Sequence, residues 1–113
     1  AMDISKKDWK LYREKLPGWQ ERHMEKLVKE YIEMLSNDDK PASEKFWTLE
    51  KRIKNDRKHP GVIIEVSKSG ALDDIIRFIS LEVITYDDIA DFSEELKQDV
   101  RDFTERRSYR YDF

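Results

Sequence analysis

The chain has 113 residues, of which 22 are Lys or Arg and 25 are Asp or Glu, giving a net charge of −3. This length fits one compact domain, and three Trp, five Tyr and five Phe are more aromatic residues than a disordered chain usually carries. The chain has no cysteine, which excludes disulfides, thiolate catalysis and cysteine-based zinc or iron–sulfur sites.

Only three glycines and three prolines occur in the chain. Domains built of strands need many tight turns, for which glycine supplies the positive φ. We therefore expect an all-α fold: one compact domain of five or six short helices over residues 1–105, followed by a tail over 106–113. Glycine-rich phosphate loops of the GxGxxG or GxxxxGK[ST] type are absent from the sequence.

Two helices are predicted before residue 36. The first spans about residues 4–16, and the Pro17–Gly18 pair is expected to end it. The second spans about 19–35, where apolar residues follow the spacing of one helix face and charges occupy the other.

A third helix is predicted over about 42–58, ending at the His59–Pro60–Gly61 sequence. Residues 62–66 read Val-Ile-Ile-Glu-Val, which is typical of a strand. No second convincing strand exists to pair with it. We therefore favour a short helix or an extended segment that fills the core, with pairing to another molecule as the alternative.

The C-terminal half contains the most apolar predicted helix, about 71–83, which we expect to be central. Thr85 and Asp88 have the spacing of a capping box at the start of a short helix over 86–91. Ser93 is expected to cap a last helix over about 94–105.

Charge is distributed unevenly along the chain. Residues 45–58 hold six basic and two acidic side chains, a net charge of +4, whereas 71–105 hold three basic and eleven acidic ones, a net charge of −8. The basic stretch forms a candidate phosphate- or nucleic-acid-binding patch of Lys51, Arg52, Lys54, Arg57 and Lys58. Trp47, Tyr109 and Tyr111 are candidate stacking residues beside it. A solvated helix end with dipole-complementing charges explains the same pattern.

The acidic half suggests a surface that presents carboxylates to a basic partner. The candidate partner-binding residues are Asp87, Asp88, Asp91, Glu94, Glu95, Asp99 and Asp102. Helix starts explain several of them without any partner. The two carboxylates that open the 94–105 helix would repel phosphate, which argues against DNA reading by that helix.

No catalytic constellation or metal motif is visible. His23 and His59 have no carboxylate or histidine partner at metal-binding spacing, and adjacent carboxylates point to different helix faces. We therefore predict neither an enzyme nor a cofactor. Trp9, Trp19, Phe46 and Trp47 are expected in the core, with Trp19 the most probable exposed member because it follows Pro-Gly.

Two segments, Lys45 to Val66 and Ile84 to Leu96, resemble a family of short, uncharacterised Firmicutes proteins that are often labelled "multidrug transporter". The similarity covers most of residues 18–104. It implies a bacterial origin and a mobile-element context, and it assigns no role to any residue. No apolar run approaches the roughly 20 residues of a membrane span, so the transporter label does not fit the sequence.

The leading hypothesis is a small cytoplasmic protein-binding module. Its sharper form is an acidic inhibitor, of the antitoxin, immunity or anti-CRISPR type, of a nucleic-acid-handling protein. The alternative is a nucleic-acid-associated protein that uses the basic helix 45–58. We expect a protein partner and no membrane, and a homo-oligomer stays open.

Overall fold

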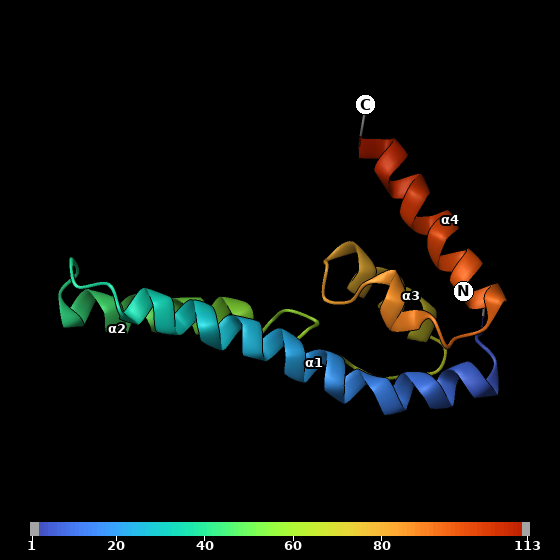
Figure 1. Ribbon diagram of the computed structural model, residues 1–113, viewed down its shortest axis with the longest axis horizontal. Helices are drawn as coiled ribbons and strands as arrows, with labels where there is room; N and C mark the ends of the chain where they lie inside the picture. The colour runs from blue at the N-terminus through green and yellow to red at the C-terminus, as the bar shows by residue number, and fades with distance from the viewer. Residues whose placement is uncertain (1–2, 112–113) are drawn as a thin grey trace. The chain divides into compact units, whose positions relative to one another are not determined.

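The computed structural model describes residues 3–111, and the side chains of residues 3–106. Within this range every regular element is a helix and no strand occurs, so the predicted all-α class is confirmed (Figure 1). The five or six predicted helices correspond to four α-helices and one short 3₁₀ helix in these residues: α1 (Lys6–Leu35), α2 (Ala42–Asp56), α3 (Ala71–Ser80), η1 (Tyr86–Ile89) and α4 (Glu94–Tyr111).

The chain divides into two compact units. The hairpin unit is Gly18–Ile64, and the terminal unit combines residues 3–17 with 65–111. Helix α1 contributes its first part to the terminal unit and the rest to the hairpin unit. That residues 1–105 act as one domain stays a prediction, and residues 106–111, expected as a tail, continue helix α4.

The two helices predicted before residue 36 are one continuous helix, α1, with Pro17 inside it. An interior proline removes a hydrogen bond and costs about 3 kcal/mol. Both neighbours of the Pro17–Gly18 pair are nonetheless buried, Leu16 and Trp19 each at 5% exposure. Full burial of one such side chain contributes about 1.5–3 kcal/mol, which offsets the defect. The predicted break is instead the boundary between the two compact units.

Helix α3 forms the centre of the terminal unit, as predicted. Six of its ten residues are buried, including the fully covered Ile75 and Phe78. Its apolar residues recur on more than one face, which is the pattern of a helix enclosed by neighbours. Around it lie the start of α1, the 3₁₀ helix and the first turns of α4, which contribute Tyr12, Ile89 and Val100 to the same core.

Two buried polar contacts connect the start of α1 to the rest of the terminal unit. Asp8 is 2% exposed, and its Oδ1 accepts a hydrogen bond from the backbone N–H of Ser93 at 2.9 Å. The Tyr12 hydroxyl donates to Oδ2 of Asp74 at 3.1 Å. Burial of the Asp74 carboxyl raises its pKa, and the hydrogen bond from Tyr12 partly opposes that rise. Each contact joins segments more than 60 residues apart.

The two predicted caps in the C-terminal half are confirmed. Thr85 and Asp88 form a capping box at η1, with the backbone N–H of Thr85 donating to Asp88 Oδ2 at 2.7 Å. Ser93 Oγ accepts from the backbone N–H of Leu96 at 3.2 Å and so caps α4. These contacts satisfy backbone donors that a helix start leaves unpaired.

Residues 63–67 form neither a helix nor a strand. The expectation that this segment fills the core is wrong, because Ile63 is 65% exposed and Val66 is 44% exposed.

The predicted aromatic core is wrong at Phe46 and Trp47. Trp19, the expected exception, is buried, whereas Phe46 and Trp47 are each 62% exposed. Trp9 is half-buried. Helical spacing identifies which residues share a face, but it does not tell whether another element covers that face.

Candidate docking surface on the helical hairpin

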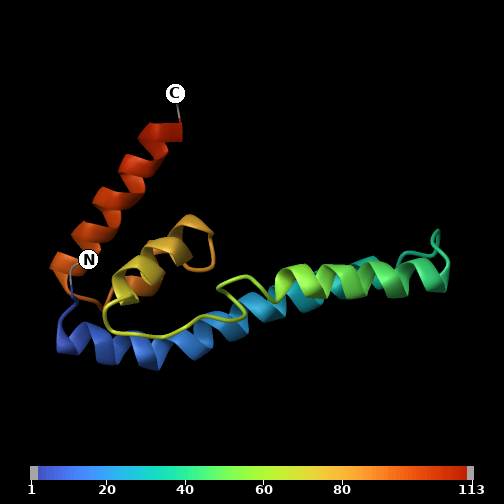
Figure 2. The ribbon, with the colours of Figure 1, turned by 180° about the vertical axis from the view of Figure 1, so that it is seen from behind.

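The hairpin unit consists of two antiparallel helices, the later part of α1 and α2. Both ribbon views show α2 running back beside α1 after the turn at residues 36–41 (Figures 1 and 2). The two helices are joined by polar contacts. The Tyr31 hydroxyl donates to Asp56 Oδ2 at 2.5 Å. Arg52 spans both helices, with Nε donating to Asp56 at 2.9 Å and Nη2 donating to Glu30 at 3.2 Å.

This polar cluster is partly shielded from water. The Arg52 guanidinium lies 5.4 Å from the centre of the Tyr31 ring, a cation–π contact. Burial, followed by the hydrogen bond to Asp56, raises the pKa of Tyr31 to about 12. The cluster fixes the register of the helices, but it supplies little apolar burial.

Helix α2 has no buried residue along its 15 residues. Its apolar side chains are nevertheless large: Phe46 and Trp47 are mostly exposed, and Ile53 is 43% exposed. The Phe46 and Trp47 rings meet edge to face, with centroids 4.9 Å apart. A helix whose apolar side chains are covered by neighbouring elements rarely leaves an aromatic pair this exposed.

Helix α1 carries a matching exposed stripe. Val28, Ile32 and Leu35 follow i, i+4 and i+7 spacing, and each is between 39% and 58% exposed. That spacing places the three side chains on one side of the helix. Phe46 and Ile53 are likewise seven residues apart on α2 and share one side of it.

An open groove of about 210 Å³ brings one residue of each stripe, Val28 and Ile53, to the same face. It is lined by Val28 from α1 and Ile53 from α2, together with Met24, Leu27, Tyr31, Asp56, Arg57 and Val62. We call the set Val28, Ile32, Leu35, Phe46 and Ile53 the apolar face. It is an exposed apolar surface of the kind that marks protein interaction sites.

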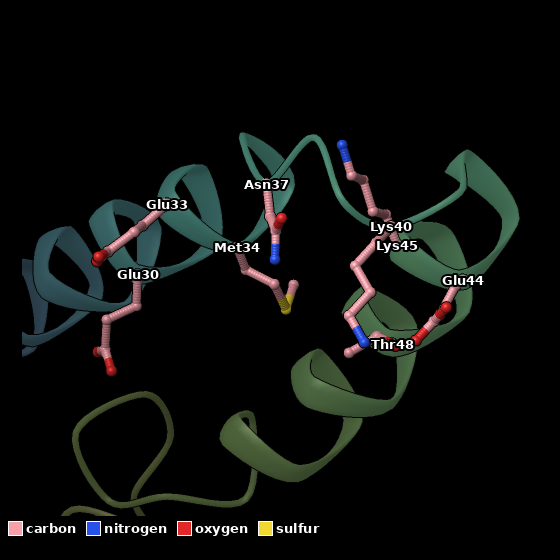
Figure 3. Close-up of a pocket in the computed structure, with 8 residues that line it drawn as sticks. All are labelled: Glu30, Glu33, Met34, Asn37, Lys40, Glu44, Lys45 and Thr48. Carbon is pink, nitrogen blue, oxygen red and sulfur yellow. Dashed lines mark hydrogen bonds and ion pairs between the residues drawn. The ribbon is translucent and has the colours of Figure 1, made fainter.

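A second, more polar groove lies nearer the turn of the hairpin. It has a volume of about 390 Å³, and Figure 3 shows Met34 and Asn37 pointing from the end of α1 toward the space between the helices. Glu44 also lines it and forms an ion pair with Lys40 at 3.2 Å. The remaining lining residues are Glu30, Glu33, Lys45 and Thr48. The mixed charges of this lining favour no single ligand.

The predicted basic patch lies on α2 and in the turn after it. Two of its five residues, Arg52 and Lys54, form ion pairs. Arg52 is held by Glu30 and Asp56, and Lys54 contacts Glu50 at 2.7 Å. The other three predicted residues, Lys51, Arg57 and Lys58, are exposed. Lys51 and Lys54 follow Trp47 at i+4 and i+7 and share its side of the helix. The side chains of Tyr109 and Tyr111 lie outside the described residues.

Local partners hold four of the seven predicted acidic residues. Asp88 closes the capping box, Asp91 forms an ion pair with Lys15 at 3.6 Å, and Asp102 accepts from Gln98 at 2.9 Å. Glu94 contacts Lys97 at 2.7 Å, and the hydrogen bond from Lys97 lowers the pKa of Glu94.

The other three predicted acidic residues, Asp87, Glu95 and Asp99, form no ion pair among the side chains that the structure describes. Asp87 and Glu95 nevertheless lie in the first turns of η1 and α4, where carboxylates suit the helix dipole. Asp87 and Glu95 are exposed, and Asp99 is half-buried.

The two histidines meet in the hairpin unit, which the sequence did not indicate. Their rings stack with centroids 4.5 Å apart, and His59 Nδ1 accepts from the backbone N–H of Gly61 at 3.0 Å. Burial, followed by the charge of His59, lowers the pKa of His23. Because 36 residues separate the two histidines, helical spacing gives no signal for this contact.

Within the described part of the chain, no group of three or more metal-ligating side chains is positioned to hold a metal ion. None of the helices described combines the length and the apolar content needed to cross a membrane. Comparisons of the chain with protein-family models, with curated proteins and with solved structures give no match.

Proposed function

We propose that the chain is a small cytoplasmic protein-binding module, and that the apolar face of the hairpin unit is its docking surface. The observation that carries this proposal is helix α2, which exposes Phe46, Trp47 and Ile53 and has no buried residue. Helices of about 12–15 residues are marginal in water without an apolar face packed against a neighbour. A protein partner that covers the face supplies that packing.

The chemistry of the face favours a helical, apolar contact surface on the partner. Its exposed side chains form one row on each helix, and an open groove lies where Val28 and Ile53 meet. Such a surface suits the ridge of a third helix. The large aromatic side chain of Phe46 is of the type that dominates binding energy at interfaces.

Photo-crosslinking tests the proposal with a matched control. Phe46, which is 62% exposed, is replaced by the photoreactive p-benzoylphenylalanine in cells that produce the protein. Phe103, a phenylalanine on α4 that is 42% exposed, is replaced in a second strain. We expect crosslinked protein adducts from position 46 and few from position 103. Equal yields from the two positions, or none from position 46, contradict the proposal.

The acidic form of the hypothesis, an inhibitor that presents Asp87, Glu95 and Asp99 to a basic partner, has less support. Four of the seven carboxylates already have local partners, and exposed charges contribute little unless several converge. Charge reversal at Asp87, Glu95 and Asp99 tests this form of the hypothesis. If the reversed variant loses a protein partner while crosslinking from position 46 is unaffected, the acidic surface is favoured.

One observation favours nucleic acid as the second candidate. The indole of Trp47 is exposed beside Lys51 and Lys54, and an aromatic ring flanked by cations suits base stacking with phosphate contacts. Lys51→Glu together with Lys58→Glu is expected to abolish retention on a nucleic-acid column if this candidate is correct. A wild-type chain that is not retained at low salt rules it out.

A further inference from the structure

The apolar face defines the shape of its partner, because it is itself a pair of antiparallel helices. Two such pairs stacked face to face make a four-helix bundle, in which each helix packs against two neighbours around a common core. The hairpin unit supplies half of that arrangement, two antiparallel helices with one exposed apolar side. We propose that the occupant of the apolar face is a second copy of this chain, which rests on the proposed function of the face.

The charges at the edge of the face are self-complementary in one arrangement. Glu21, Glu25 and Lys29 border the α1 side, next to Met24 and Val28. Arg57 borders the α2 side, in the groove that Met24 and Ile53 also line; Asp56, which lines the same groove, is already paired with Arg52. Glu25 and Arg57 therefore lie at the same end of the hairpin, on its two different helices.

A two-fold axis parallel to the helices brings these opposite charges of the two copies together. It places α1 of one copy over α2 of the other, so that Glu25 of each copy lies at the level of the partner's Arg57. Such an interface is isologous, with the same patch on both copies and two equivalent charge contacts. An axis perpendicular to the helices places α1 over α1 and loses both contacts.

The area of the face limits the size of the interface. At 1.5 Å per residue, the 15 residues of α2 span about 22 Å, and two helices side by side are about 20 Å wide. Each copy therefore offers on the order of 450 Å², so the dimer lies near the lower limit of roughly 1,000 Å² for specific interfaces. We expect a reversible dimer with micromolar rather than nanomolar affinity.

Sedimentation equilibrium of the full chain, from the micromolar to the millimolar range, measures this association directly. We expect the wild-type chain to be in monomer–dimer equilibrium. Ile53→Asp and Ile32→Asp are expected to be monomeric because each puts a charge into the apolar face. Leu81→Asp is the control: Leu81 is exposed to a similar degree as Ile53 but lies in the terminal unit, and this variant should dimerise like the wild type.

A charge exchange makes the test independent of folding defects, since it changes only exposed side chains. Arg57→Glu alone and Glu25→Lys alone each place like charges at both contacts and should raise the dissociation constant by about tenfold. A mixture of the two variants restores opposite charges at both contacts of a heterodimer. We expect the mixture to associate as tightly as the wild type.

Two results overturn the inference. One is a wild-type chain that is monomeric over the whole concentration range, and the other is a mixture that associates no better than its components. If position 46 then crosslinks to a different protein, the proposed function stands and only self-association fails. If position 46 crosslinks to nothing, the proposed function fails as well.

Discussion

Replacement of Asp8 is the strongest single test of how the terminal unit is held together. Its carboxylate is 2% exposed, accepts from the backbone N–H of Ser93 at 2.9 Å, and also accepts from Ser93 Oγ at 2.5 Å. The Ser93 hydroxyl oxygen in turn accepts from the N–H of Leu96 at 3.2 Å. One side chain at the start of α1 therefore orients the residue that caps α4.

The expected loss follows from these contacts. A hydrogen bond to a charged group contributes about 1.5–3 kcal/mol, and a buried donor left unpaired costs about 1–3 kcal/mol. The favourable position of Asp8 in the first turn of α1 adds about 0.5 kcal/mol. Because removing a charge from a buried position also recovers desolvation energy, we expect Asp8→Ala to lower the free energy of unfolding by about 3 kcal/mol. Asp8→Asn keeps an acceptor for the Ser93 N–H and should cost about 1–2 kcal/mol.

Urea unfolding at neutral pH, followed by far-ultraviolet circular dichroism, measures both losses. A double-mutant cycle with Ser93→Ala isolates the contact, and we expect a coupling energy of at least about 1 kcal/mol between the two positions. An Asp8→Ala loss below about 1 kcal/mol, or strict additivity with Ser93→Ala, refutes the reasoning.

Three further predictions concern α1 and the hairpin unit. Gly18→Ala should raise the free energy of unfolding by about 0.5–1 kcal/mol, because a methyl group at this helical position meets no neighbouring atom. Gly61→Ala should lower the free energy of unfolding, because a methyl group at this position overlaps the His23 ring. Chemical denaturation of the two variants measures these opposite changes in stability. Trp19→Ala should cost about 3–5 kcal/mol and Trp47→Ala less than about 0.5 kcal/mol at concentrations where the chain is monomeric, by the same measurement. Stability should fall as the pH is lowered from 7 to 5, because the pKa of His23 is lower in the folded chain than in the unfolded one, so the unfolded state binds more protons there. His23→Gln should flatten that profile in thermal melts, and an unchanged slope contradicts the role given to His23.

Local signals in the sequence predicted the parts of the fold that depend on local chemistry. The capping box at Thr85 and the cap at Ser93 were correct because a cap is decided by residues within one helical turn. The central position of α3 followed from apolar residues around most of its circumference.

Predictions that depend on what covers a helix failed. Phe46 and Trp19 both lie in apolar helical patterns, yet Phe46 is exposed and Trp19 is buried. Pro17 indicated a helix end by its local chemistry, and burial on both sides of it outweighed that signal. Such outcomes are decided by tertiary packing, which the spacing of residues along the chain does not encode.

The candidate site was missed for the same reason. Charge counting drew attention to the basic stretch and the acidic half, where Arg52, Lys54 and Asp91 turned out to have ion-pair partners. Of the residues that form the apolar face, Phe46 was expected in the core and is exposed instead. The signal of this face was present as helical spacing on both helices, but only the structure shows that these side chains stay exposed when the two helices of the hairpin unit pack together.

Amide hydrogen exchange of α2 as a function of protein concentration tests most directly whether a second copy covers the apolar face. Residues 42–56 lack buried side chains within one chain, so their protection should be low in dilute solution and should rise as the dimer forms. The amides of α3, which packs inside the terminal unit, serve as the internal reference and should not change. Protection of α2 that is the same at every concentration contradicts the account.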